Sequence, residues 1–166
     1  MNKIEYIIIH CSDSEWGCSR EIRKWHLQNG WKDIGYQFVI LNGHILPKYF
    51  LSHLNGMVEC GRYLDEDLYI EQEEIGAHTL GYNKNSIGIC LIGKKLAVAD
   101  RVNTNRVTTF TTEQMVSLIE LVKELIDIYK INPVNVIGHC ETESGKAQGK
   151  TCPDFNIKLV RDELMI

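Results

Sequence analysis

Three side chains of this sequence could together hold a metal ion: His10, His139 and Cys152. Each histidine follows a short apolar run, and Cys152 lies in the segment GKTCP, where glycine and proline indicate a tight loop. Two imidazoles and a thiolate suit Zn²⁺, and catalytic zinc sites use three protein ligands and leave one position open for water. The pattern also fits an alternative in which Cys152 is a buried structural thiol and His139 a hydrogen-bonded residue at a strand end.

The elements that must position these ligands are predicted to be strands. Apolar runs at residues 4–9 and 134–137 predict two strands, which end at His10 and at Gly138-His139. The same reading predicts further strands at residues 37–41, 57–61 and 86–92. Because α/β folds commonly place ligand sites at the ends of buried strands, we expect the two imidazoles at equivalent places.

Helices are predicted between and after these strands. Ser19 and Asp154 are expected N-caps, and Thr111 with Gln114 has the spacing of a capping box. The predicted helices cover residues 19–29, 111–130 and 154–164. Strands that alternate with helices predict an α/β fold with a central mixed β-sheet flanked by helices, in a single domain over residues 1–166.

The composition limits the classes of partner. The chain has 166 residues, of which 44% are hydrophobic and 24% charged, and its net charge is −4. These values are ordinary for a soluble globular protein, and the acidic balance argues against binding of a nucleic-acid backbone. No apolar run approaches the roughly 20 residues that span a bilayer. We therefore expect no nucleic-acid partner, no membrane insertion and a monomer.

The six cysteines raise the question of disulfides. The N-terminal residues MNKIEY do not resemble a signal peptide, so we expect synthesis in the cytoplasm with mostly reduced thiols. At least one cysteine is then free to bind a metal.

Several segments resemble one known family. They are IIIHCS (7–12), REIRKWHLQNGWKDIGYQFVI (20–40), GAHTLGYNKNSIGICLIG (76–93), FTTEQMVSL (110–118) and GHCETESGKAQGKTCPDF (138–155). In this order they resemble the type-2 N-acetylmuramoyl-L-alanine amidases, the phage lysozyme-type amidases related to peptidoglycan recognition proteins. The resemblance implies an enzyme that hydrolyses the amide bond between N-acetylmuramic acid and L-alanine in peptidoglycan. The phage subgroup is the most similar, which implies a phage or prophage endolysin released to the cell wall through a holin.

The resemblance also implies roles for individual residues. It implies that His10, His139 and Cys152 bind one catalytic Zn²⁺ and that Tyr36 and Lys150 assist catalysis. His78, Asn83 and Ser86 match a segment beside the cleft, and His78 and Asn83 are expected to bind substrate. From the residues alone, Tyr36 could instead be a core tyrosine, Lys150 a solvated loop lysine, and Asn83 and Ser86 turn residues before a strand.

Three features depart from what the resemblance leads us to expect: residues 43–56, Cys140 and the loop at 141–148. Residues 43–56 are longer than the expected short turn and read as an irregular stretch, which could line the groove, contact a partner or be passive. Cys140 places a second thiol beside His139. Residues 94–110 and 141–148 are expected to be polar loops.

Three alternative functions remain open at this stage. One is a peptidoglycan-binding module without activity, although Cys152 favours an enzyme. The second is an amidase that recycles soluble muropeptides, and the third is a regulatory protein that binds a polymerase.

Overall fold

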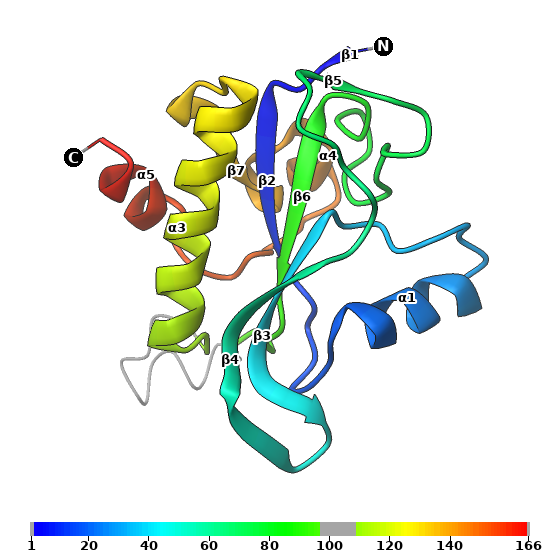
Figure 1. Cartoon of the computed structure of the whole chain (residues 1–166), viewed down its shortest axis with the longest axis vertical. Helices are drawn as coiled ribbons and strands as arrows, with labels where there is room; N and C mark the ends of the chain where they lie inside the picture. The colour runs from blue at the N-terminus through cyan, green and yellow to red at the C-terminus, as the bar shows by residue number, and fades with distance from the viewer. Residues whose placement is uncertain (1, 97–108, 166) are drawn as a thin grey trace.

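A five-stranded sheet forms the centre of the computed structural model, which describes residues 2–96 and 109–165. The strand order is β4-β3-β6-β2-β7, and a separate two-stranded sheet pairs β1 with β5 (Figure 1). The five central strands are β2 (Tyr6–Cys11), β3 (Phe38–Leu46), β4 (Tyr49–Cys60), β6 (Ser86–Leu91) and β7 (Val136–Gly138). The small sheet consists of β1 (Asn2–Lys3) and β5 (Tyr69–Ile70).

The central sheet is mixed, which confirms the predicted fold class. β2 pairs in parallel with both β6 and β7, and β6 pairs in parallel with β3. Only the β3–β4 pair of this sheet is antiparallel, as a hairpin requires. The three strands β6, β2 and β7 therefore end at the same edge of the sheet.

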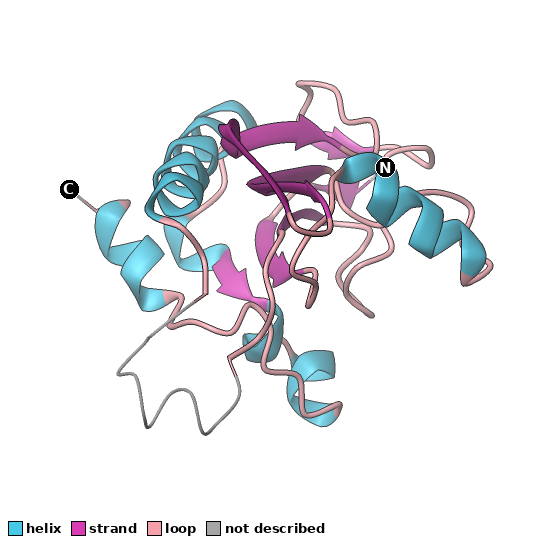
Figure 2. Cartoon of the chain, turned by 90° about the horizontal axis from the view of Figure 1, so that it is seen from below, coloured by secondary structure: helices cyan, strands magenta, loops and turns pink. Residues whose placement is uncertain are grey.

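Alternate residues of β2 and β6 face opposite sides of the sheet. Ile7, Ile9 and Cys11 of β2 belong to the larger apolar core, together with Leu118 and Val122 of the long helix α3 (Thr112–Tyr129). Cys90 of β6, which pairs with His10, belongs to a second core on the side of helix α1 (Ser19–Gln28). Figure 2 shows the strands between these two helices. The period-two geometry of a strand thus directs His10 away from α3.

The helices lie where the sequence predicts them, but two of the three have other N-caps than predicted. Thr111 and Gln114 form the predicted capping box, and α3 ends at Lys130 in a left-handed C-cap. Cys18 rather than Ser19 is the N-cap of α1, and its side chain makes no capping hydrogen bond. The last helix, α5 (Lys158–Glu163), begins after Ile157 and not at Asp154. Asp154 has a left-handed backbone, with φ 73°, and the non-helical residues 155–157 separate it from α5, so Ile157 and not Asp154 is the N-cap.

The prediction that residues 43–56 form an irregular stretch is wrong. These residues form the far half of the β3–β4 hairpin, which turns at Pro47-Lys48. Gly43 and Gly56 have φ near +80°, at 82° and 84°, and the pairing shows register shifts between Ile40 and Leu46. Such irregular pairing hides the alternation of apolar and polar residues that predicts a strand.

Two further expectations need correction near the C-terminus. Residues 133–135 form a 3-10 helix, η1 (Pro133–Asn135), so β7 starts later than predicted. The expected loop at 141–148 contains α4 (Glu143–Ala147), preceded by the 3-10 helix η2 (His139–Glu141). Thr142 caps α4 by accepting a hydrogen bond from the Gly145 N–H. Most of the predicted loop 94–110 lies outside the described residues.

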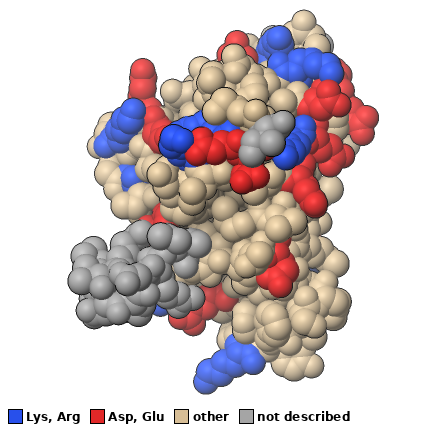
Figure 3. Space-filling view, turned by 90° about the vertical axis from the view of Figure 1, so that its left-hand side faces the viewer, with Lys and Arg blue, Asp and Glu red and all other residues tan. Residues whose placement is uncertain are grey.

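The surface formed by α3 and α5 carries both signs of charge. Acidic and basic side chains are interspersed on this face (Figure 3). Among the described helices, none is both long enough and apolar enough to cross a membrane.

Candidate metal centre and active site

The three predicted metal ligands lie together. One ligand atom from each of His10, His139 and Cys152 lies within 4.8 Å of the other two. The two imidazole rings have centroids 4.7 Å apart. His10 and Cys152 are buried, whereas His139 is half-buried and faces a pocket. These three side chains could hold one metal ion, and a borderline-soft cation such as Zn²⁺ suits the donor set.

Strand register explains why the two imidazoles meet. Ile9 of β2 pairs with Gly138 of β7, so the residues that follow them, His10 and His139, lie at the same level along the two strands. His10 is the fifth residue of β2, one position before the strand ends. The prediction that both imidazoles occupy equivalent strand ends is therefore confirmed, with His10 still inside its strand.

The turn after β7 is fixed from both sides of His139. The Thr142 hydroxyl donates to the His139 carbonyl at 2.8 Å, and α4 packs so closely that a Cβ on Gly145 would lie 1.9 Å from this oxygen. Glu141 accepts a hydrogen bond from the Gly138 N–H at 2.9 Å and two from Arg161. The turn therefore holds His139 in one backbone position.

Two backbone hydrogen bonds bring Cys152 to the same place. The Cys140 N–H donates to the Cys152 carbonyl at 2.9 Å, which joins the loop around Cys152 to the turn that carries His139, called here the histidine turn. The Cys11 N–H donates to the Cys152 sulfur at 3.0 Å. The Cys11 side chain and burial together raise the pKa of Cys152 well above its ordinary value. A bound cation would offset this cost, because a coordinated thiol loses its proton.

His78 contacts the metal ligand His10 directly. Its Nδ1 lies 3.1 Å from His10 Nε2, and the Thr79 hydroxyl lies 3.3 Å from the same His10 atom. Since Nε2 of His10 is engaged there, Nδ1 is the His10 atom available to a metal. Burial lowers the pKa of His10 well below its ordinary value and that of His78 to about 3. Both rings are therefore neutral at neutral pH, which is the form that binds metal.

Glycine in β6 leaves room for the His78 ring. A Cβ on Gly88 would approach ring atoms of His78 to 2.7 Å, closer than real contacts allow. Behind the ring, the Ser86 hydroxyl lies 3.5 Å from His78 Nε2 and donates to the Tyr82 carbonyl at 2.7 Å. A row of contacts thus leads from β6 through His78 to His10.

Asn83 stabilises a turn through its side chain and also lines the pocket. Its side-chain oxygen accepts hydrogen bonds from the backbone N–H groups of His78, at 2.9 Å, and Thr79, at 2.8 Å. These bonds fix the backbone that presents His78 to His10. The turn chemistry considered for Asn83 is present, and the residue also lines the pocket.

Tyr36 lies beside the metal ligands, two residues before the start of β3. Its ring centroid is 5.1 Å from that of His10 and 6.3 Å from that of His78. Its carbonyl accepts a hydrogen bond from the Arg62 N–H at 2.8 Å, which holds its backbone against the β4 end. Burial, followed by the nearby Cys90, raises the pKa of Tyr36 well above its ordinary value. The hydroxyl therefore stays protonated and able to donate.

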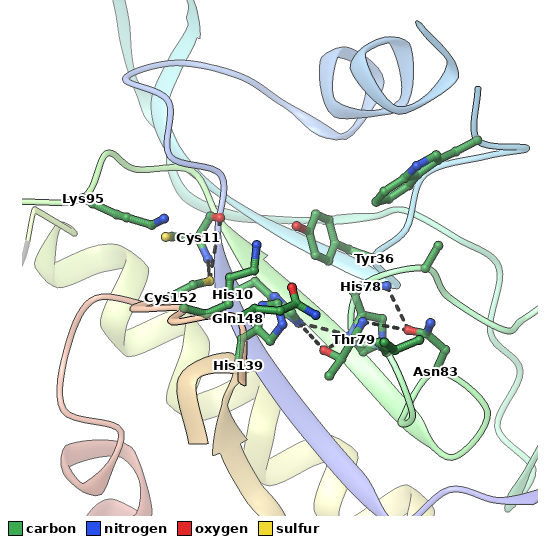
Figure 4. Close-up of a pocket in the computed structure, with 14 residues that line it drawn as sticks. His10, Cys11, Tyr36, His78, Thr79, Asn83, Lys95, His139, Gln148 and Cys152 are labelled. Carbon is green, nitrogen blue, oxygen red and sulfur yellow. Dashed lines mark hydrogen bonds between the residues drawn. The ribbon is translucent and has the colours of Figure 1, made fainter. Parts of the chain in front are cut away.

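All seven predicted site residues line one open pocket with a volume of about 450 Å³ (Figure 4). The described residues that line it include none from the segment 43–56. The lining is His10, Cys11, Trp31, Tyr36, Ala77, His78, Thr79, Leu80, Asn83, Lys95, His139, Gln148, Lys150 and Cys152.

Two lysines supply positive charge to this pocket. Burial, then Lys150, then Lys95 lower the pKa of His139. Lys150 is exposed, and its backbone N–H donates to the Gly145 carbonyl at 2.9 Å, which fixes the loop before Cys152. The ammonium groups would favour negative charge that develops beside His139.

Sequence reasoning missed Lys95, Thr79 and Gln148 as pocket residues. Lys95 lies four residues after the end of β6, whereas His139 directly follows β7, so the sequence carries no direct sign that Lys95 lines the pocket. Thr79 carries no comparable signal, since its role depends on how the turn after Gly76 folds. Cys140, the second thiol beside His139, is not part of the metal cluster found among the described residues.

Comparisons with known proteins identify the family of this chain. Residues 1–155 match the family model described as N-acetylmuramoyl-L-alanine amidase. The endolysin of Escherichia phage T7 is 32% identical over 155 residues, which cover 92% of this chain and 82% of that protein. The endolysin of Enterobacteria phage T3 is also 32% identical, over 93% of this chain and 83% of that protein.

Solved structures show the same fold. The N-acetylmuramoyl-L-alanine amidase LysC from Clostridium intestinale superposes with a TM-score of 0.70 at 22% identity, covering 99% of this chain and 87% of that chain. Drosophila PGRP-LB gives a TM-score of 0.58 at 25% identity, covering 94% and 85%. With the family match over residues 1–155, these findings show that the chain belongs to the type-2 N-acetylmuramoyl-L-alanine amidases, enzymes that act on peptidoglycan.

Proposed function

We propose that this chain hydrolyses the amide bond between N-acetylmuramic acid and L-alanine with one Zn²⁺ held by His10, His139 and Cys152. Residues 1–166 would act as a single zinc amidase domain. The observation that carries the proposal is the meeting of three ligand atoms within 4.8 Å in the pocket of an amidase-family chain.

The chemistry of the donor set supports zinc. Two neutral imidazoles and one thiolate give the ligands a total charge of −1, and His10 Nε2 is already engaged by His78. When bound, Zn²⁺ would act as a Lewis acid on the scissile carbonyl and lower the pKa of a water molecule.

Lys150 and Tyr36 would act on the charge that develops during amide hydrolysis. Addition to the carbonyl produces an oxyanion, and the Lys150 ammonium at the pocket wall would stabilise it. The Tyr36 hydroxyl, which remains protonated, would donate a hydrogen bond to the same oxygen or help to move a proton to the departing nitrogen.

His78 and Asn83 would position other groups as well as contact substrate. His78 orients the His10 ring, and Asn83 holds the backbone that carries His78. Both residues line the pocket, so a substrate that fills it would contact their exposed atoms.

We further propose the biological role of an endolysin from a phage or prophage. The support is the likeness to the phage T7 and T3 endolysins, which covers more than nine-tenths of this chain. In this role the protein would act as a monomer on the cell wall after release through a holin-type lesion.

Cell-wall sacculi provide the test. The protein should lower the turbidity of a sacculus suspension, a chelator should stop this, and added Zn²⁺ should restore it. Mass spectrometry of the products should show free stem peptides with an N-terminal L-alanine. Cleavage confined to soluble muropeptides would contradict the wall-lytic role, and cleavage that survives full metal removal would contradict the zinc mechanism.

A further inference from the structure

A second lysine enters the pocket from the end of β6. Lys95 follows the strand by four residues, is partly buried and lines the same pocket as the metal ligands. Figure 4 shows its side chain extending toward Cys11 and Cys152, on the side of the ligands away from His78 and Asn83. The metal ligands therefore lie between Lys95 and the His78–Asn83 wall.

Asp13 holds Lys95 in this position. Its carboxylate accepts a hydrogen bond from the Lys95 backbone N–H at 3.2 Å, and its other oxygen lies 3.5 Å from the Lys95 ammonium. The Asp13 side chain is 51% exposed and that of Lys95 34%. An ammonium has three donors, so one such long contact leaves Lys95 able to bind another anion from the pocket side.

The electrostatic effect of Lys95 reaches the metal ligands. Lys95 is among the causes that lower the pKa of His139, after burial and Lys150. Burial opposes the charged form of Lys95, but Asp13, followed by Cys11 and Cys152, raises the pKa of Lys95 above its ordinary value. The ammonium is therefore charged at neutral pH, and Lys95 lines the pocket that contains the ligands.

We propose that Lys95 binds a free carboxylate of the stem peptide, on the peptide side of the scissile amide. This inference rests on the proposed amidase function. The lactyl carboxyl of muramic acid is consumed in the scissile amide, so the sugar side offers no free carboxylate nearby. The peptide side does, because the D-glutamate after L-alanine is linked through its side chain and keeps its α-carboxyl. A cation at one end of the pocket thus selects the peptide end of the substrate.

The test gives the zinc-loaded enzyme two muropeptides as substrates. They differ only in whether the α-carboxyl of D-glutamate is free or amidated. The wild-type enzyme should prefer the free acid through a lower KM, with a roughly tenfold difference in kcat/KM, as expected for a hydrogen bond to a charged group. Lys95→Gln should abolish the preference, and Lys95→Arg should retain it.

The neighbouring Lys94 offers a matched control. Its ammonium pairs with Glu15 at 3.5 Å, its side chain is 61% exposed, and it is not among the pocket-lining residues. Lys94→Gln should keep the wild-type preference, so a change caused only by lost surface charge would appear in both variants.

The outcomes separate this inference from the proposed function. A preference that persists in Lys95→Gln, or that the wild-type enzyme lacks, would overturn the role of Lys95 while cleavage itself upholds the amidase. An equal fall in kcat for both muropeptides would place Lys95 at the reacting carbonyl and also overturn it. Wild-type protein that cleaves neither muropeptide would overturn the proposed function, and this inference with it.

Discussion

The surroundings of His10 determine its protonation state and which ring nitrogen can bind a metal. Its position at the end of β2 marks it in the sequence, but burial makes it neutral and the contact with His78 leaves Nδ1 for the metal. The sequence indicated the two histidines because each follows an apolar run, and Cys152 because it lies in a tight loop close to His139. It did not indicate the His10–His78 contact, which joins residues 68 positions apart and depends on the turn that Asn83 fixes.

The first prediction concerns Lys150. Lys150→Ala should retain zinc and lower kcat by roughly 10²–10³, the usual cost of losing one oxyanion stabiliser. The measurement is single-substrate kinetics with metal content determined on the same sample. Lys146→Ala, on α4 and exposed, is the control and should keep wild-type kinetics. An unchanged kcat in Lys150→Ala would remove this lysine from the mechanism.

A second prediction concerns the orienting role of His78. His78→Phe keeps an aromatic ring but loses the nitrogen that faces His10, so zinc affinity should fall roughly 10- to 100-fold. His78→Gln, which can still hydrogen-bond, should lose less. Competition with a chelating dye measures the affinities. If the phenylalanine variant binds zinc as tightly as the wild-type protein, His78 does not orient His10.

At the scale of elements, three parallel strands that end at one edge build the site. The apolar runs predicted β2 and β6, and the capping box predicted where α3 begins. Both signals are local in the sequence. The hairpin over residues 43–56 was missed because its irregular pairing hides the alternation of apolar and polar residues, and helix α4 because it depends on close packing against the His139 carbonyl. Distant contacts of this kind leave little trace in a local pattern.

A prediction at this scale concerns the Glu141–Arg161 pair, which joins η2 to α5. Arg161 donates to both Glu141 oxygens, at 2.9 and 3.0 Å, and to the Val136 carbonyl at 3.0 Å. Lysine cannot reproduce the two parallel hydrogen bonds, so Arg161→Lys should lower the free energy of unfolding by on the order of 1 kcal/mol. Urea unfolding at neutral pH measures this.

The exposed pair Lys158–Asp162 is the control for that experiment. It lies on the same helix, with Nζ 2.7 Å from the carboxylate and side chains 66% and 48% exposed. Lys158→Gln should change stability by less than about 0.5 kcal/mol, because solvent screens such pairs. Equal effects of the two substitutions would show that the Glu141–Arg161 pair does not stabilise the histidine turn.

At the scale of the whole molecule, the two faces of the central sheet have different roles. One face packs against α3 in the larger core, and the other presents His10 and the pocket beside α1. Among the described residues, none from the segment 43–56 lines the pocket. The family and the mixed sheet were predicted from the sequence and are confirmed, and the ligand set stays a prediction whose three residues lie together. Lys95, four residues beyond β6, was recognised only in the assembled pocket.

The central claim is that one metal ion joins His10, His139 and Cys152, and metal content with turnover in two cysteine variants tests it most directly. Cys152→Ala should lose stoichiometric zinc and activity together, while circular dichroism shows that the fold is retained. Cys140→Ala, which alters a neighbouring thiol outside the cluster, should keep both. Full zinc content with undiminished turnover in Cys152→Ala would contradict the claim.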